Sequence, residues 1–301
     1  MSSVSAPPSG LLPLGGRPRW RDYLRAIWAR REFTYNLAAG QLRGQNLDTL
    51  LGNFWQLINP ILLIGVYYLV FGVLFGLDGS GDDADETISA IRDLRPANYI
   101  GFLAVGVFVY SYLQRCVTGG SSAIVGNLGL IRSLQFPRAV LPASTVIKEV
   151  LGFGSSLVVM AAVMVFTGEG VTFSWLLFPV VFVLMTMFAF GGALITARLT
   201  EAVRDVRNLL PFVFRLLFYV SGILYDITRF TSNRPNLAAL EWLFLFNPFY
   251  VYVSLVREVV MVTSTHSTPG LLWLAAVAWS LLALVGGMSY FIGAEKKYGR
   301  G

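Results

Sequence analysis

A short polar segment divides two long apolar runs near the middle of the chain. It reads NLGLIRSLQFPRAVLPAS, covers residues 127–144, and carries Arg132 and Arg138 together with two prolines. Its apolar residues recur at helical spacing up to Pro137, which stops a helix because the residue before a proline disfavours helical dihedral angles. A short helix with apolar and basic groups is suited to docking on another protein. A surface loop without a partner is the alternative.

Charged residues are rare within the apolar runs, and Arg215 is the deepest of them. At 1.5 Å per residue, it lies about 9 Å from the start of its helix. Ionisable residues inside a membrane often mark a substrate path. Arg215 is therefore a candidate contact for a phosphate-bearing head group or for a neighbouring helix. The alternative is that its guanidinium extends to the membrane surface.

Several kinds of chemistry are excluded by what the sequence lacks. The chain has one cysteine, Cys116, and one histidine, His266, which excludes an internal disulfide and a multi-histidine metal site. It has no G-x-x-x-x-G-K-[ST] phosphate-binding loop and no evident Ser/His/Asp or Cys/His pair for nucleophilic catalysis. Energy for uphill transport would have to come from a partner.

The elements that position these residues are membrane spans. The chain of 301 residues is 55% hydrophobic and 13% charged, whereas soluble proteins have about 25% charged residues. The fold class is therefore all-α integral membrane, because the apolar runs are long enough to cross a hydrocarbon core of about 30 Å. Six transmembrane helices are predicted, near residues 57–77, 99–118, 149–167, 171–195, 209–227 and 271–293.

The distribution of positive charge predicts the orientation of these spans. Lys and Arg gather before the first span, in the loops after the second and fourth spans, and after the last span. Both termini are therefore expected in the cytoplasm of a multi-pass protein of the plasma membrane, and the acidic loop 76–98 outside. Residues 1–18 are interpreted as a disordered tail, 19–56 as a cytoplasmic amphipathic segment, and 57–301 as the transmembrane domain.

The amphipathic segment before the first span begins with a predicted interface helix. Its apolar residues recur at helical spacing between Trp20 and Trp28, and basic residues occupy the other faces. Such a helix lies in the membrane interface. Arg25, Arg30 and Arg31 would gather anionic lipid head groups there, unless they act only as a generic anchor.

The apolar sequence before the last span is interrupted. It reads LEWLFLFNPFYVYVSLVREVVM and is broken at Asn247-Pro248, so that neither half makes an ordinary span. This pattern predicts an external re-entrant helical hairpin before the sixth span. A seventh span is the alternative.

Together these segments resemble the ABC-2 type permeases that export polysaccharide, the Wzm/TagG/KpsM group. The resemblance extends from about Trp28 to Tyr298. It is carried by LLGNFWQLINPILLIGVYYLVFGVLF, by the pattern N-x-x-L-I-x-x-x-x-FPR-x-x-LP that begins at Asn127, by RDVRNLLPFVFRLLFYVSGILYD and by FNPFYVYVSLVRE. The arginine-rich composition is similar to that of actinobacterial members, which suggests a cell-wall galactan as cargo.

The resemblance implies a homodimer bound to two copies of a Walker-motif, Wzt-like ATPase subunit. That partner would bind ATP and Mg²⁺, while this chain would hold no cofactor or metal, catalyse no reaction and bind no nucleic acid. The complex would export a polyprenyl-pyrophosphate-linked polysaccharide of the O-antigen or galactan type. A cytoplasmic coupling helix between spans two and three would contact the ATPase through Asn127, Leu130, Ile131, Arg132, Phe136, Pro137 and Arg138.

Aromatic residues in spans one, two and five fit this cargo. Sugar rings need stacking surfaces and scattered hydrogen bonds, although the same residues also serve as interface anchors and in helix packing. The candidate channel residues are Tyr67, Tyr68, Phe108, Tyr110, Tyr112, Phe218 and Tyr219.

Two other functions stay open. The chain could be an ABC-2 permease for a small lipid or drug, with the same coupling to an ATPase and a different cavity. It could also be a membrane-embedded glycosyl or lipid transferase, which would need acidic residues at the membrane face. Asp205 is the single cytoplasmic candidate for that role.

Overall fold

The computed structural model describes residues 20–45, 52–74, 98–228, 238–262 and 269–295, and all regular structure in these ranges is helical. The predicted tail 1–18 and nearly all of the predicted external loop 76–98 lie outside the described residues. The α-helices are α1 (Trp20–Ala29), α2 (Arg31–Gly44), α3 (Trp55–Tyr67), α5 (Tyr99–Ala123), α6 (Leu128–Ser133), α7 (Val140–Phe166), α8 (Phe178–Ala202), α9 (Val206–Val220), α11 (Ala238–Leu245), α12 (Pro248–Val260) and α13 (Pro269–Ile292).

A helix is present at each of the six predicted spans, but the helices differ in length. α9 has 15 residues, which corresponds to about 22 Å and is shorter than a hydrocarbon core of about 30 Å. α3 has 13 residues and continues as a π-helix, Tyr68–Leu74. In the described part of the chain, four helices are long and apolar enough to cross a membrane: Tyr99–Ala123, Val140–Phe166, Phe173–Ala202 and Pro269–Ile292. Six spans therefore remain a prediction.

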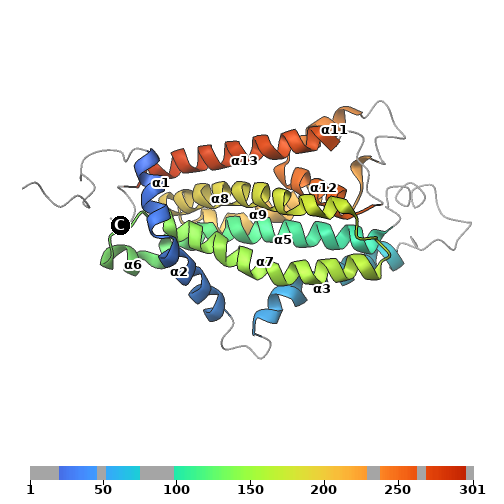
Figure 1. Cartoon of the computed structure of the whole chain (residues 1–301), viewed down its shortest axis with the longest axis horizontal. Helices are drawn as coiled ribbons and strands as arrows, with labels where there is room; N and C mark the ends of the chain where they lie inside the picture. Colours follow the sequence, from blue (N-terminus) through green and yellow to red (C-terminus); the bar gives the residue numbers. More distant parts are fainter. Residues whose placement is uncertain (1–19, 46–51, 75–97, 229–237, 263–268, 296–301) are drawn as a thin grey trace, which may run out of the picture.

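α5 is the central helix of the bundle and packs against α3, α7, α8, α9 and α12 (Figure 1). Small residues permit the closest of these contacts. A Cβ added at Gly120 of α5 would lie 2.5 Å from the Cα of Ala193 on α8. Backbones that approach through small residues are typical of helices that associate in lipid. As a result, most side chains of α5 are buried, apart from one stripe.

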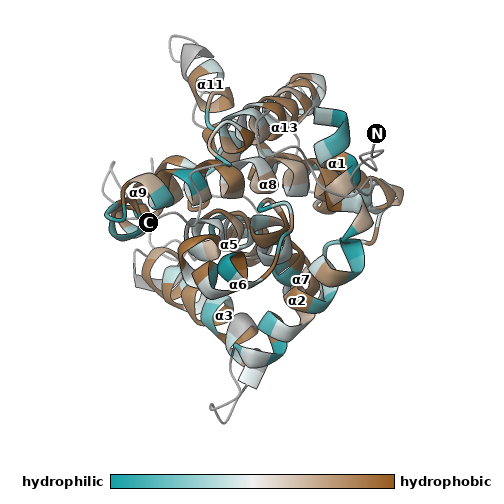
Figure 2. Ribbon diagram, turned by 90° about the vertical axis from the view of Figure 1, so that its left-hand side faces the viewer, coloured by the Kyte–Doolittle hydropathy of each residue, from teal (hydrophilic) through white to brown (hydrophobic). Residues whose placement is uncertain are grey.

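The shorter elements gather at the two ends of the long helices (Figure 1). One end, which we call the α6 end, carries α1, α2, α6 and the last residues of α13 (Figure 2). Tyr23, Leu141 and Phe291 belong to an apolar cluster at this end that is separate from the main core. The other end carries α11 and α12.

The N-terminal segment forms two helices where the sequence predicted one interface helix. α1 and α2 are separated at Arg30, and α2 packs against α7. α1 directs Tyr23 and Ile27 toward the apolar cluster of the α6 end. Trp28 on its other side is 69% exposed. The exposed apolar stripe of α1 suits the membrane interface.

The predicted coupling helix ends earlier than expected. The sequence allowed a helix up to Phe136, whereas α6 ends at Ser133 and Leu134 is extended, with φ −129° and ψ 143°. Tertiary contact outweighs the local pattern here, because the ring of Phe136 packs against Phe33 of α2 with centroids 5.7 Å apart.

The predicted external segment has its break at Asn247, between α11 and α12. The Asn247 side chain accepts a hydrogen bond from the backbone N–H of Phe249 at 3.0 Å, which caps α12. α12 is almost entirely buried and packs against α5, α8 and α13. Its position at one end of the bundle agrees with a short hairpin, and its re-entrant path through the membrane remains a prediction.

Candidate functional site

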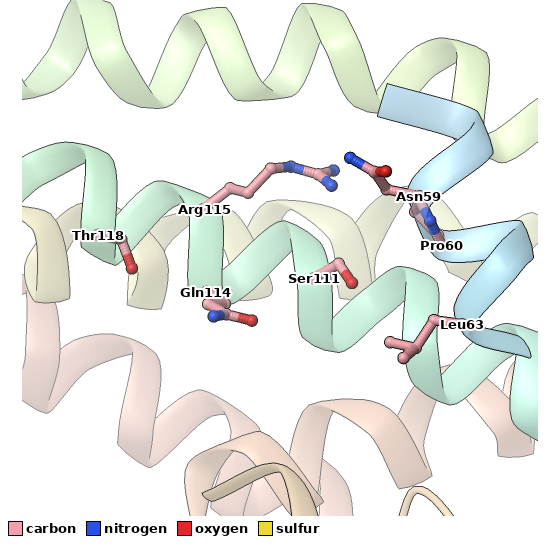
Figure 3. Close-up of a pocket in the computed structure, with 7 residues that line it drawn as sticks. All are labelled: Asn59, Pro60, Leu63, Ser111, Gln114, Arg115 and Thr118. Carbon is pink, nitrogen blue, oxygen red and sulfur yellow. The ribbon is translucent and has the colours of Figure 1, made fainter. Parts of the chain in front are cut away.

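A cavity of about 270 Å³ lies between α3 and α5. α3 contributes Asn59, Pro60 and Leu63 to its wall, and Figure 3 shows the Arg115 side chain reaching from α5 toward Asn59. The residues that α5 contributes are all polar: Ser111, Gln114, Arg115 and Thr118.

These four residues form one stripe along α5. Ser111, Gln114, Arg115 and Thr118 are spaced three and four residues apart, which places them on one helix face. They are partly exposed, whereas the residues of α5 on its other faces are buried against neighbouring helices. Polar side chains in a membrane span rarely face lipid. The polar stripe of α5 therefore faces a hydrated space or another protein.

Arg115 is held in place by a carboxylate on α7. Its Nε donates to Oε2 of Glu149 at 3.0 Å, and Nζ of Lys148 lies 2.9 Å from Oε1 of the same carboxylate. The Glu149 side chain is 5% exposed and that of Arg115 is 26% exposed. A buried carboxylate requires such partners, since its desolvation is costly without them.

The aromatic residues predicted to line a channel lie in two different environments in the fold, one buried and one partly exposed. Phe108, Tyr110 and Tyr112 are buried in the core of the chain. Tyr110 donates its hydroxyl to the backbone carbonyl of Phe214, and the Tyr112 hydroxyl pairs with Thr186 at 2.9 Å. These three side chains contribute to packing and are not among the residues that line the cavity, so their part in a channel stays a prediction.

The remaining predicted channel residues lie on α3, its π-helical extension and α9. Phe218 is buried and stacks on Tyr67 with ring centroids 5.3 Å apart. Tyr67 and Tyr68 are partly exposed, and Tyr219 is exposed. Sequence reasoning missed the polar stripe of α5, although its helical spacing was a signal that could have identified it.

Arg215 is exposed on α9 and interacts electrostatically with Tyr67 of α3. An exposed guanidinium is costly against lipid, so this face of α9 is suited to a polar path or a protein neighbour. Arg25, Arg30 and Arg31 are exposed at the α6 end, on α1 and at the start of α2. They are far along the chain from the cavity and no contact joins them to it in the described residues.

The predicted coupling residues have different environments. Leu130, Ile131 and Phe136 are half-buried and pack against the apolar cluster of the α6 end, and Pro137 is buried. Asn127 donates its side-chain amide to the carbonyl of Ala123 at 2.8 Å. The exposed positions of this segment include Arg132 and also Leu134, which is not among the predicted coupling residues.

The chain matches the ABC-2 type transporter family over residues 35–261. It belongs to this family. It is 27% identical over 262 residues to the O-antigen export system permease protein RfbA of Myxococcus xanthus, covering 86% of this chain and 92% of that protein. A protein of the same name from Klebsiella pneumoniae is 25% identical over 215 residues, covering 71% and 74%. The resemblance found in the sequence is thus confirmed, and this ABC-2 protein is a multi-pass membrane protein.

The transferase alternative depends on Asp205. Asp205 is exposed at the turn before α9. Among the residues that the structure describes, no group of three or more His, Cys, Asp or Glu side chains could hold a metal ion.

Hydrogen bonds connect three separate segments of this ABC-2 protein at the α6 end. Tyr23 of α1 donates its hydroxyl to Oε1 of Glu295, just after α13, at 3.0 Å. The same oxygen accepts the backbone N–H of Arg138 at 3.2 Å, and the Tyr23 hydroxyl accepts the N–H of Ala139 at 3.2 Å. α1, the segment after α6 and the residues just after α13 therefore meet at one carboxylate.

This carboxylate makes the stability of the α6 end depend on pH. Burial raises the pKa of Glu295, and the hydrogen bonds from Tyr23 and Arg138 act in the opposite direction. The folded state then binds the proton more tightly than the unfolded state, so stability falls as the pH rises from about 4.3 through the raised pKa.

The variant Glu295→Gln is expected to remove this part of the pH dependence, because its amide oxygen still accepts both hydrogen bonds and carries no charge. Thermal unfolding of the purified protein between about pH 4 and about pH 8 measures how steeply stability changes with pH. Glu32→Gln, at an exposed position of α2, is the matched control and should keep the wild-type slope. Equal slopes for wild type and Glu295→Gln would contradict the assignment.

Proposed function

We propose that this chain is the membrane subunit of an ABC exporter for a lipid-linked polysaccharide of the O-antigen or galactan type. The observation that carries the proposal is the polar stripe of α5. Its hydroxyl, amide and guanidinium groups lie at a cavity wall in a membrane protein and offer hydrogen bonds to a hydrated glycan. The relatives from Myxococcus xanthus and Klebsiella pneumoniae are named as O-antigen export permeases, which supports the same class of cargo.

The proposed assembly is a homodimer with two copies of an ATPase subunit that binds ATP and Mg²⁺. Family membership supports an ATPase partner, since the matched family is that of ABC-2 type transporters. In the proposed orientation both termini and the α6 end lie in the cytoplasm. The exposed Tyr219 and the partly exposed Tyr67 and Tyr68 would add stacking surfaces along the path.

Depletion of this chain in its source cells tests the cargo. We expect surface polysaccharide to disappear and lipid-linked polysaccharide to accumulate on the cytoplasmic side, where labelling of intact and lysed cells with the same lectin distinguishes the two. Wild-type chain supplied from a plasmid should restore the surface signal. Normal surface polysaccharide in depleted cells, with retention of a small amphiphile instead, would favour a permease for a small lipid or drug.

The ATPase is expected to contact the exposed part of the coupling segment. Leu134 is 49% exposed, so Leu134→Asp should weaken binding of the ATPase more than tenfold without unfolding the permease, because an apolar side chain at a protein interface is lost. Co-purification and ATP hydrolysis measure this effect.

Ile131→Asp provides the comparison for that experiment. Ile131 packs against the apolar cluster of the α6 end, so this variant should lower the unfolding temperature of the permease as well as ATPase binding. Full ATPase binding by the Leu134→Asp permease would place the interface elsewhere.

A further inference from the structure

We infer that Arg115 binds an oxyanion of the exported substrate, the phosphate of its lipid carrier, and that Glu149 positions it for this contact. The inference rests on the proposed function and assigns a residue to it. The head-group contacts predicted from sequence are other arginines, on α1, on α9 and at the start of α2.

The geometry of the pair leaves the outer edge of the guanidinium available. Glu149 engages Nε of Arg115. Within the described residues, no hydrogen bond is formed by the two terminal nitrogens of Arg115, and the side chain extends along the cavity toward Asn59 (Figure 3). A planar guanidinium edge with two parallel N–H donors matches phosphate, which it binds through two hydrogen bonds.

The charges around the pair favour an anion. Glu149 contacts two cations, Arg115 and Lys148, so this group of three side chains carries one unit of positive charge. Lys148 alone could neutralise the buried carboxylate, and a purely structural ion pair would not need the second cation.

The depth of Arg115 suits a lipid phosphate that enters from the α6 end. Arg115 is eight residues before Ala123, the last residue of α5, which corresponds to about 12 Å along the helix axis. Ser111, Gln114 and Thr118 flank it on the same stripe and provide hydroxyl and amide groups to the first sugars attached to the phosphate.

Binding of defined lipids to the purified chain in nanodiscs tests the inference. The probes are a polyprenyl pyrophosphate and the polyprenol of equal length, titrated separately and followed by native mass spectrometry. We expect wild type to prefer the pyrophosphate by at least tenfold, Arg115→Gln to lose the preference, and Arg115→Lys to keep part of it. The double variant Arg115→Gln/Glu149→Gln should also lose the preference. In this variant the buried Glu149 carboxylate, which would otherwise lack its Arg115 partner, is replaced by a neutral amide.

Lys148→Gln is the matched control, since it removes the same unit of charge from a residue that does not line the cavity. It should keep more of the preference than Arg115→Gln does, because the guanidinium donors are still present. Equal loss in Lys148→Gln and Arg115→Gln would show a general effect of charge and overturn the inference, as would an unchanged preference in Arg115→Gln.

A third probe separates the two sources of the oxyanion. If a soluble acidic oligosaccharide without a lipid competes with the pyrophosphate for wild type and not for Arg115→Gln, the oxyanion belongs to the glycan. That outcome overturns the assignment to the carrier phosphate. Loss of surface polysaccharide after depletion, combined with normal pyrophosphate binding by Arg115→Gln, would leave the proposed function intact and reject this inference alone.

Discussion

Alanine at Gly287 is expected to separate α8 from α13 and to unfold much of the bundle under conditions in which wild type is stable. A Cβ at Gly287 would overlap the carbonyl of Gly191 on α8, and a Cβ at Gly191 would overlap the backbone of Ala283 on α13. Overpacking costs about 1–3 kcal/mol in a core whose side chains can shift. Here the clash is with backbone, so we expect a loss above about 3 kcal/mol.

Gly286 provides the control for this experiment. It is the neighbour of Gly287 on the same helix, and a Cβ there would meet no atom within 4 Å. Gly286→Ala should therefore leave stability within about 0.5 kcal/mol of wild type. Thermal unfolding in one detergent measures both variants, and equal unfolding temperatures would show that this helix crossing is not as close as described.

Removal of the Arg257 guanidinium is expected to release α12 from the bundle. Arg257 is 2% exposed. Its guanidinium donates to the carbonyls of Phe102, Gly222 and Ile223 at 2.8–3.3 Å, and it lies over the Phe102 ring. Arg257→Leu leaves three buried carbonyls without these donors, each loss costing about 1–3 kcal/mol, so we expect a total destabilisation of at least about 3 kcal/mol.

Two further variants distinguish the effect of these hydrogen bonds from a simple effect of charge. Arg257→Lys keeps the charge but has one ammonium group in place of the guanidinium fork, so it should recover part of the stability. Arg207→Leu, at an exposed position of α9, should be nearly neutral. Hydrogen exchange of the α12 backbone amides reports the local effect. Unchanged protection in Arg257→Leu would contradict the claim that Arg257 holds α12 in the bundle.

The helical elements were predictable from sequence because lipid requires every backbone hydrogen bond to be satisfied within a segment. Apolar runs therefore marked a helix at each of the six predicted spans, and Asn247-Pro248 marked the break before α12. The end of α6 was not predictable, since it depends on the contact of Phe136 with Phe33, which lies about a hundred residues earlier in the chain.

The site was predicted less well than the helices. Hydropathy does not tell which face of a wholly apolar helix is inside the protein, and so Tyr110 and Tyr112 were assigned to a channel although the fold buries them. In the sequence, Arg115 is an isolated basic residue near the end of an apolar run. Its partner Glu149 lies on a different helix, and that pairing becomes apparent only in three dimensions.

The short length of α9 has a consequence for biogenesis. A helix of 15 residues with Arg215 on its exposed face and Pro211 in its interior is a weak signal for insertion by the translocon, since one central arginine costs about 2.5–3.5 kcal/mol. Phe218 packs against Tyr67 of α3 and Tyr110 of α5, with ring centroids 5.3 and 5.2 Å apart. We therefore expect α9 to enter the bilayer only after α3 and α5 are in place, so that the order of synthesis is also the order of assembly.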